Sequence, residues 1–207
     1  MAECPSTFLK EVMDLFSLTA LEICEGQQMD MEFEQRNDVT AEEYLEMIRL
    51  KTAVLLAASL KIGARLGGAS VEDADRLYDF GMHIGVAFQL KDDLLDVYGN
   101  AKVFGKNIGG DILCNKKTYM LIKALEHANA DQHNQLNSWI NAETFQPAEK
   151  IAAVTELYDR IGVKAVCENK ILEYSNRAME SLAAVSIAEE KKEELKKIIE
   201  NLIHREV

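Results

Sequence analysis

Proline is almost absent from this chain of 207 residues, which carries only Pro5 and Pro147. Because proline ends or kinks helices, the long stretch between these two positions permits uninterrupted helices. Aromatic residues make up 7% of the chain, whereas Ala, Leu, Ile, Glu and Lys are common, and this composition favours helices over strands. With 48% hydrophobic residues, the chain can build one well-packed core. The sequence predicts a single all-α domain over residues 1–207.

Capping residues and glycines indicate where the helices begin and end. Thr40 and Glu43 form a capping box, and Gly26 and the pair Gly67-Gly68 are suited to end helices. These signals predict helices at 6–25, 40–66, 70–98, 116–128, 131–141, 147–161, 162–185 and 188–203. The second is apolar on all sides between residues 53 and 60, so we expect it to be central and buried, with the third antiparallel to it. The last two helices are more polar, and we expect them to be peripheral.

Charge and cysteine usage exclude several classes of protein. The net charge is -12, whereas a general nucleic-acid binder needs a basic face, so no nucleic-acid partner is expected. The four cysteines include no closely spaced pair, which excludes a CxxC redox site and a zinc knuckle and favours reduced thiols in a cytoplasmic protein. The longest apolar stretch, 53–60, is far shorter than the roughly 20 residues of a membrane span, so stable membrane insertion is not expected.

The segment FQLKDDLLD, residues 88–96, is the most informative in the chain. On a helix, the spacing of Asp92, Asp93 and Asp96 places three carboxylates near one face, where their charges repel. A cation would relieve this repulsion. Oxygen ligands without His or Cys favour magnesium, which usually shares its coordination shell with substrate phosphates. The alternative interpretation is an ordinary solvated acidic turn.

The surroundings of the aspartates favour the metal site. Gly81 and Gly85 precede them on the same helix, and glycine inside a helix costs about 1 kcal/mol relative to alanine. The two glycines are explained if another helix or a ligand comes close. The following loop, 99–115, is rich in glycine. Between residues 99 and 122, four lysines (102, 106, 116 and 117) face one acid, Asp111, in a chain that is otherwise acidic. Lysines and backbone amides beside a carboxylate-bound metal are what a diphosphate requires.

Two further segments carry unexplained polar residues. Lys51, followed by Thr52, lies in the apolar stripe of its own helix, so its ammonium either extends to solvent or faces a cavity that holds an anion. The polar residues Gln27, Gln28 and Asp30 follow Gly26. A helix cap or a turn would explain them without any functional role.

Four motifs together resemble the polyprenyl synthetase family, which includes the farnesyl and geranylgeranyl diphosphate synthases. FQLKDDLLDVYG resembles the second aspartate-rich motif of this family, and GKNIGGDILCNKKT resembles its GKxxGxDxxxxKxT signature. The Lys51-Thr52 pair resembles its KT pair, and CEGQQMD resembles its GQxxD segment. The motifs occur in the family's order, and the resemblance extends from about residue 9 to residue 203.

This resemblance implies a helical bundle of the isoprenoid synthase type, usually a homodimer. It also implies a reaction in which magnesium ions promote ionisation of an allylic diphosphate, which is then attacked by isopentenyl diphosphate. Asp92 and Asp96 would bind Mg²⁺, and Asp93 would support them. The remaining roles implied are binding of the allylic diphosphate by Lys51, Lys106 and Lys116, placement of oxygens near the allylic cation by Thr52 and Gln89, and further substrate contacts by Gln27 and Phe88.

The chain departs from the family pattern because it contains only one DDxxD motif. The resemblance implies an earlier aspartate-rich motif well before the GQ segment, so we expect the amino-terminal helices of the bundle to be missing. The apolar flank at residues 54–60 should then be exposed, and the chain should be inactive alone. Two alternatives remain, which are a catalytically silent regulatory subunit of a complete synthase and a class I terpene cyclase. The GKxxGxD loop argues against the cyclase.

Overall fold

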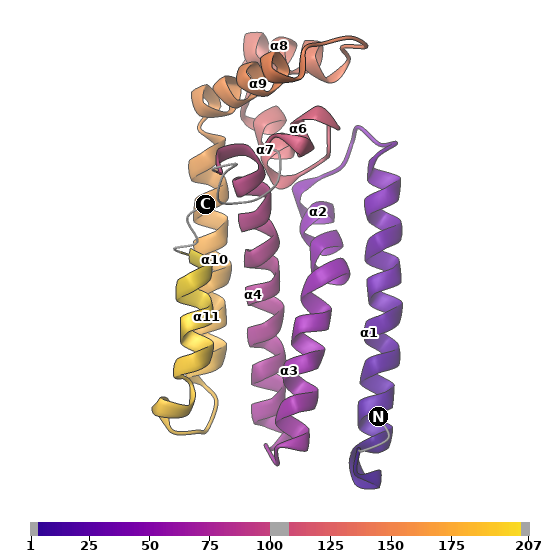
Figure 1. Cartoon of the computed structure of the whole chain (residues 1–207), viewed down its shortest axis with the longest axis vertical. Coiled ribbons are helices and arrows are strands. Elements are labelled where there is room, and N and C mark those ends of the chain that lie inside the picture. The colour runs from indigo at the N-terminus through magenta and orange to yellow at the C-terminus, as the bar shows by residue number, and fades with distance from the viewer. Residues whose placement is uncertain (1–3, 100–107, 204–207) are drawn as a thin grey trace.

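The computed structural model describes residues 4–99 and 108–203, and every regular element within these ranges is helical (Figure 1). The all-α prediction is confirmed. In chain order the elements are α1 (Ser6–Phe33), α2 (Ala41–Ile48), the π-helix η1 (Arg49–Ala53), α3 (Val54–Leu66), α4 (Val71–Tyr98), α6 (Gly110–Leu113), α7 (Tyr119–His127), α8 (Ala130–Ile140), α9 (Pro147–Ile161), α10 (Val163–Ala183), the 3₁₀-helix η2 (Glu189–Lys191) and α11 (Glu193–Ile203).

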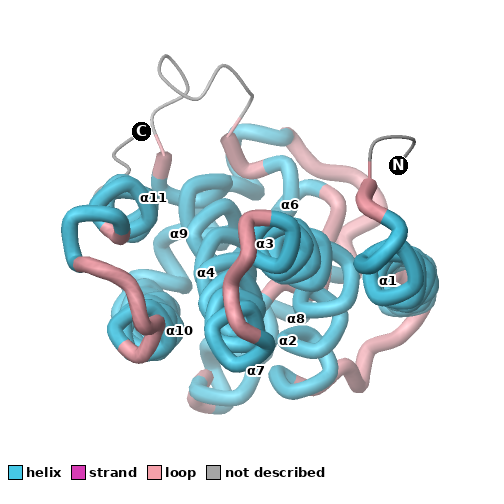
Figure 2. Tube along the Cα trace, turned by 90° about the horizontal axis from the view of Figure 1, so that it is seen from below, coloured by secondary structure: helices cyan, strands magenta, loops and turns pink. Residues whose placement is uncertain are grey.

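Helix α4 forms the centre of the bundle. Its most extensive contacts are with α10 on one side and α3 on the other. The long helices run side by side, and α8 and α9 cross one end of the bundle (Figures 1 and 2). Helices α3 and α4 are joined by a short turn at Gly67-Gly68, and Ser70 caps α4 by accepting a hydrogen bond from the Asp73 amide (3.0 Å). The predicted antiparallel central pair is confirmed.

Two glycines allow α4 to approach α3 and η1 closely. A Cβ atom on Gly81 would lie 2.7 Å from the Cα of Ala57, and one on Gly85 would lie 2.6 Å from the Cα of Ala53. These distances are far below a normal carbon contact, so only glycine fits at either position. Of the two explanations for these glycines, a neighbouring helix and a nearby ligand, the structure shows the neighbouring helix.

The prediction that α1 ends at Gly26 is wrong, because the helix continues to Phe33. Gly26 is buried and keeps the helical backbone, and its role is close packing against η1. A Cβ atom there would overlap the backbone nitrogen of Lys51 and lie 2.8 Å from the Leu50 Cβ. Gln27 and Asp30 therefore lie on a helix rather than in a turn.

Two expectations about burial are also wrong. Helix α10 is not peripheral, because it buries Cys167, Ile171 and Ala178 against the centre of the bundle. Helix α3 is not buried on all sides, because Leu55 and Leu56 are 53% and 41% exposed. The expected exposure of the flank 54–60 is therefore met only in part, because Val54, Ala57 and Ala58 are buried.

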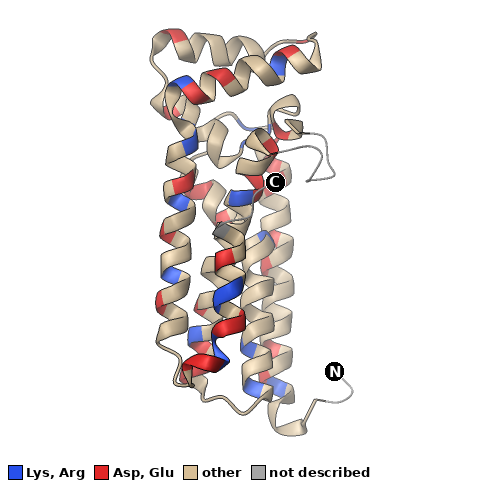
Figure 3. Cartoon of the chain, turned by 60° about the vertical axis from the view of Figure 1, so that its left-hand side comes forward, with Lys and Arg blue, Asp and Glu red and all other residues tan. Residues whose placement is uncertain are grey.

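The predicted helix at 116–128 begins later, at Tyr119, because Thr118 caps it through a hydrogen bond from the Leu121 amide (3.4 Å). No helix in the described ranges combines the length and the apolar character that crossing a bilayer requires. On the side that carries α10 and α11, acidic and basic residues alternate instead of forming one basic patch (Figure 3).

Candidate functional site

The three motif aspartates of α4 have different surroundings. Asp92 and Asp96 are partly exposed, whereas Asp93 is only 5% exposed. The hydroxyl of Tyr44, which is buried on α2, donates a hydrogen bond to Asp93 Oδ2 (2.5 Å). Burial raises the pKa of Asp93 to about 7, although the bond from Tyr44 works in the opposite direction. Asp93 therefore faces the core, which leaves Asp92 and Asp96 as the accessible carboxylates of the motif.

Asp96 holds the turn that carries α6 against the end of α4. Its carboxylate accepts a hydrogen bond from the Asp111 amide (3.0 Å), and its carbonyl accepts one from the Gly109 amide (2.6 Å). Gly109 has a φ of +83°, a conformation that favours glycine. This arrangement joins two of the four sequence motifs and brings the segment from Asp111 to Lys116 beside the aspartates.

Lys116 is a charged group within an acidic surrounding. Its Nζ lies 3.6 Å from Asp111 Oδ1. Burial opposes the charged form of Lys116, but the negative charges of Asp111, Asp93 and Asp30 outweigh it and raise the pKa of the ammonium. Burial also raises the pKa of the Asp111 carboxyl. Lys116 therefore stays protonated at neutral pH and is surrounded by acids that favour a cation.

Lys51 lies in the π-helix η1, where the backbone departs from the regular α-helix. Such π-segments occur frequently at functional sites. Its ammonium is half-exposed and donates to Asp30 Oδ2 on α1 (2.6 Å). The close approach at Gly26 brings α1 near enough to η1 for this ion pair. The GQxxD and KT motifs, 21 residues apart, are therefore in direct contact.

A groove of about 600 Å³ opens between the end of α1 and the α6 turn. Asp30, Glu34 and Asp111 line it together with Lys116 and Lys117. The partner of Lys51 and the carboxyl-terminal lysines of the signature motif thus share one groove. A ligand in it would meet both signs of charge.

The structure also places the remaining predicted residues. Thr52, next to Lys51, donates a hydrogen bond to Gln89 Oε1 on α4 (3.1 Å). The two residues expected to place oxygens near the allylic cation are therefore in contact. Gln27 and Phe88 are exposed, and the contacts described for the chain do not test their predicted roles. Lys106 lies outside the described residues.

Within the part of the chain that the structure describes, a magnesium site formed by protein ligands alone is not found. Over residues 4–99 and 108–203, no three His, Cys, Asp or Glu side chains form a group that could hold a metal ion. The accessible carboxylates Asp92 and Asp96 nevertheless fit Mg²⁺, which binds through one or two carboxylates and takes its other oxygens from water and phosphate. The assignment of these two residues as metal ligands stays a prediction.

The sequence of this chain matches a known protein family. The family model described as polyprenyl synthetase matches residues 1–158. This chain belongs to the polyprenyl synthetase family. The resemblance inferred from the four motifs is therefore confirmed, and with it the isoprenoid-synthase type of helical bundle.

Individual relatives agree with the assignment to this family. The chain is 37% identical over 201 residues to the short chain isoprenyl diphosphate synthase of Methanothermobacter thermautotrophicus, covering 97% of this chain and 61% of the relative. Among solved structures, a geranylgeranyl pyrophosphate synthase superposes with a TM-score of 0.91 at 37% identity, covering 98% of this chain and 63% of the other.

Another similar structure was solved with ligands bound. It is the Corynebacterium glutamicum geranylgeranyl pyrophosphate synthase complexed with isoprenyl diphosphate and magnesium, with a TM-score of 0.88 at 29% identity, covering 98% of this chain and 57% of that one. The chain thus spans about 60% of the length of these three relatives.

Sequence reasoning gave no role to Tyr44 or Asp111. Tyr44 and Asp93 are 49 residues apart in the sequence, and the sequence around neither residue predicts that they form a hydrogen bond. Asp111 did have a signal, because it occupies the acidic position of the GKxxGxD signature. Its backbone amide, rather than its carboxylate, makes the bond that holds the turn.

Proposed function

We propose that this chain carries the allylic-diphosphate side of a prenyltransferase site, in which an allylic diphosphate is condensed with isopentenyl diphosphate. The observation that carries the proposal is the bond between the Asp96 carboxylate and the Asp111 amide. It places the accessible carboxylates of α4 beside the turn of Lys116. Carboxylates for a metal and an ammonium for free oxygens are the two elements that diphosphate binding needs.

We propose the following roles for the residues of this chain. Asp92 and Asp96 would hold Mg²⁺, which when bound neutralises the departing diphosphate as a Lewis acid. Asp93, held by Tyr44, would fix the rotation of α4 so that the other two carboxylates face the ligand. The ammonium groups proposed to contact diphosphate oxygens are those of Lys51, Lys106 and Lys116.

Thr52 and Gln89 would stabilise the positive charge that develops on the allylic carbon. Their hydrogen bond holds both side chains before the substrate arrives, and charge placed in advance is usually the largest catalytic contribution. Gln27 and Phe88 are proposed to contact the substrate, and homodimerisation is proposed from the family.

The single DDxxD motif within these 207 residues leads to a specific expectation for the chain alone. It should bind an allylic diphosphate with magnesium but should not condense it with isopentenyl diphosphate. The same feature keeps a second candidate function open, a catalytically silent subunit that regulates a complete synthase. Addition of the chain to such a synthase would then change the rate of the synthase, whereas the leading proposal expects no change.

Calorimetry with an unreactive thiolo analogue of geranyl diphosphate tests the proposal. We expect binding that requires Mg²⁺ and falls at least about tenfold in Asp92→Asn and in Lys116→Met. Lys123→Met is the matched control, because Lys123 pairs with Glu126 on α7, away from the groove. Binding that persists without Mg²⁺ would contradict the aspartate assignment. Equal affinities for Lys116→Met and Lys123→Met would contradict the lysine assignment.

A further inference from the structure

Lys150, in the first turn of α9, is the most unusual charged residue in the fold. It is only 1% exposed, and lysine is rarely buried without a charged partner. Among the ion pairs of the described residues, none involves Lys150 and a carboxylate. Burial lowers the pKa of its ammonium. Burying an ammonium without a carboxylate partner is energetically unfavourable, so the position of Lys150 requires an explanation. The proposed reaction assigns Lys150 no role.

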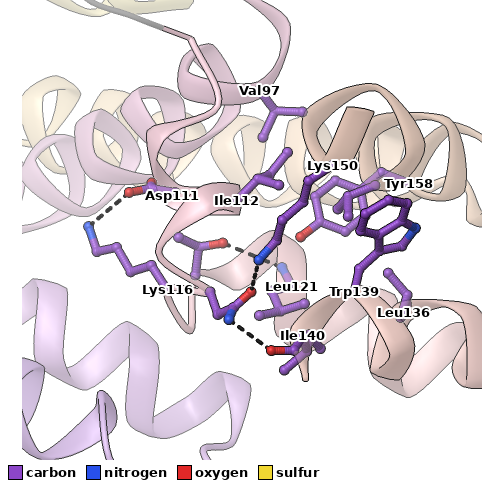
Figure 4. Close-up of a pocket in the computed structure, with 13 residues that line it drawn as sticks. Val97, Asp111, Ile112, Lys116, Leu121, Leu136, Trp139, Ile140, Lys150 and Tyr158 are labelled. Carbon is purple, nitrogen blue, oxygen red and sulfur yellow. Dashed lines mark hydrogen bonds and ion pairs between the residues drawn. The ribbon is translucent and has the colours of Figure 1, made fainter. Parts of the chain in front are cut away.

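The contacts of Lys150 lead to one residue of the site turn. Its Nζ donates to Asn115 Oδ1 (2.7 Å) and lies 4.3 Å from the centre of the Phe145 ring. The side-chain amide of Asn115 in turn donates a hydrogen bond from Nδ2 to the backbone carbonyl of Ile140, at the end of α8 (3.0 Å). Figure 4 shows Lys150 extending from α9 toward this turn and linked to it by a dashed bond. Asn115 is therefore held from both α8 and α9.

Asn115 has a backbone conformation that needs such support. Its φ is +52°, and no other residue except glycine has a positive φ within the described ranges. A side chain makes this conformation unfavourable, although asparagine tolerates it better than most residues. The next residue is Lys116, whose amide donates to the Asp111 carbonyl (3.0 Å) and whose carbonyl accepts from the Thr118 amide (2.8 Å). The conformation of Asn115 thus sets the direction in which Lys116 leaves the turn.

We infer that Lys150 is a positioning residue for diphosphate binding, which acts by fixing Asn115 and through it the turn that presents Lys116. This inference rests on the proposed function, in which Lys116 contacts the diphosphate. In this inference Lys150 does not contact the substrate itself; it lines a small pocket on the inner side of the turn together with Trp139, Val154 and Tyr158. A purely structural lysine would join α8 to α9 without affecting the ligand.

Three variants separate the positioning role from a structural one. Lys150→Met keeps the apolar stem and removes the hydrogen bond. Asn115→Gly keeps the positive φ and removes the side chain that Lys150 holds. The double variant tests whether the two act through each other. Lys192→Met is the matched control, because Lys192 is 2% exposed and pairs with Glu189. It follows η2 directly, and the segment that joins η2 to α11 lies at the end of the bundle opposite α8 and α9 (Figure 1).

Two readouts are needed. Amide hydrogen exchange at Lys116 and Thr118 reports the order of the turn in the ligand-free protein. Calorimetry with inorganic pyrophosphate and Mg²⁺ reports the affinity. We expect both single variants to speed exchange at these amides and to weaken binding about tenfold, and the double variant to be no worse than either. Lys192→Met should change neither readout.

The contrary results are equally clear. Unchanged exchange at Lys116 and unchanged affinity in Lys150→Met would overturn the inference, as would losses that multiply in the double variant. If Lys150→Met does not fold, Asn115→Gly still tests the link on which the inference depends: unchanged exchange and affinity in that variant would show that the Asn115 side chain does not order the turn, and would overturn the inference. A wild-type chain that does not bind pyrophosphate would overturn the proposed function, while the exchange data would still support or overturn the positioning of the turn.

Discussion

Replacement of Gly85 by alanine should loosen both the bundle and the site. The added Cβ would lie 2.6 Å from the Cα and 2.7 Å from the Cβ of Ala53. Because ordinary carbon contacts begin near 3.5 Å, α4 would have to move away from η1 by about 1 Å. Gly85 lies one turn before Gln89, and Ala53 directly follows Thr52. The movement would therefore lengthen the 3.1 Å bond between Thr52 and Gln89.

Two opposing contributions set the size of the effect. Alanine is favoured over glycine inside a helix by about 1 kcal/mol. Overpacking a core usually costs about 1–3 kcal/mol, and here the obstacle is backbone, which cannot rotate away. We therefore expect Gly85→Ala to lower the free energy of unfolding by about 1–2 kcal/mol, the upper range of overpacking less the helix gain.

Urea unfolding followed by circular dichroism measures this loss. Gly63→Ala is the matched control, because Gly63 is also helical but a Cβ there would meet nothing within 4 Å. The control should gain up to about 1 kcal/mol, so the two substitutions should have opposite signs. If Gly85→Ala is as stable as the wild-type chain, the close contact between α4 and η1 does not exist and the reasoning is refuted.

Three further outcomes are expected. Burial raises the pKa of Asp93 to about 7, above its ordinary value of 3.8, so the folded chain holds this proton more tightly than the unfolded chain does. Without Mg²⁺, stability should fall as pH rises from about 4 to about 7, and Asp93→Asn should flatten that slope in urea titrations. Tyr44→Phe removes the donor to Asp93 and should cost about 1–3 kcal/mol at pH 8, a loss that an unchanged midpoint would contradict. The exposed apolar residues Leu21 and Leu55 favour self-association, so light scattering at micromolar concentration should give a dimer or larger species, and a monomer would contradict this.

The long helices could be predicted because their signals are local. Both reciprocal hydrogen bonds of the capping box between Thr40 and Glu43 are present, and Gly81 and Gly85 pack against a neighbouring helix. The sequence predicts a helix end at Gly26 wrongly, because a glycine that ends a helix cannot be distinguished in sequence from one that admits a neighbouring helix. Its packing partner lies more than 20 residues away, and only the fold reveals which role applies.

The site could be predicted in its members but not in its connections. Lys51, Thr52 and the aspartates were identifiable by motif, yet the partners Asp30 and Gln89 come from other helices. The separate role of Asp93 depends on burial by α2, which spacing along α4 cannot reveal. Lys150 carries no motif, and its position beneath the site turn follows from the way α9 crosses the end of the bundle.

The central claim is that the accessible carboxylates and lysines of this site bind a metal and a diphosphate together. Calorimetric titration of Mg²⁺ in the presence and absence of inorganic pyrophosphate tests it most directly, after correction for the affinity of magnesium for pyrophosphate in solution. We predict that each ligand raises the affinity of the wild-type chain for the other by the same factor, and that Asp92→Asn abolishes this coupling. Independent binding of the two ligands, or coupling that persists in Asp92→Asn, would contradict the claim.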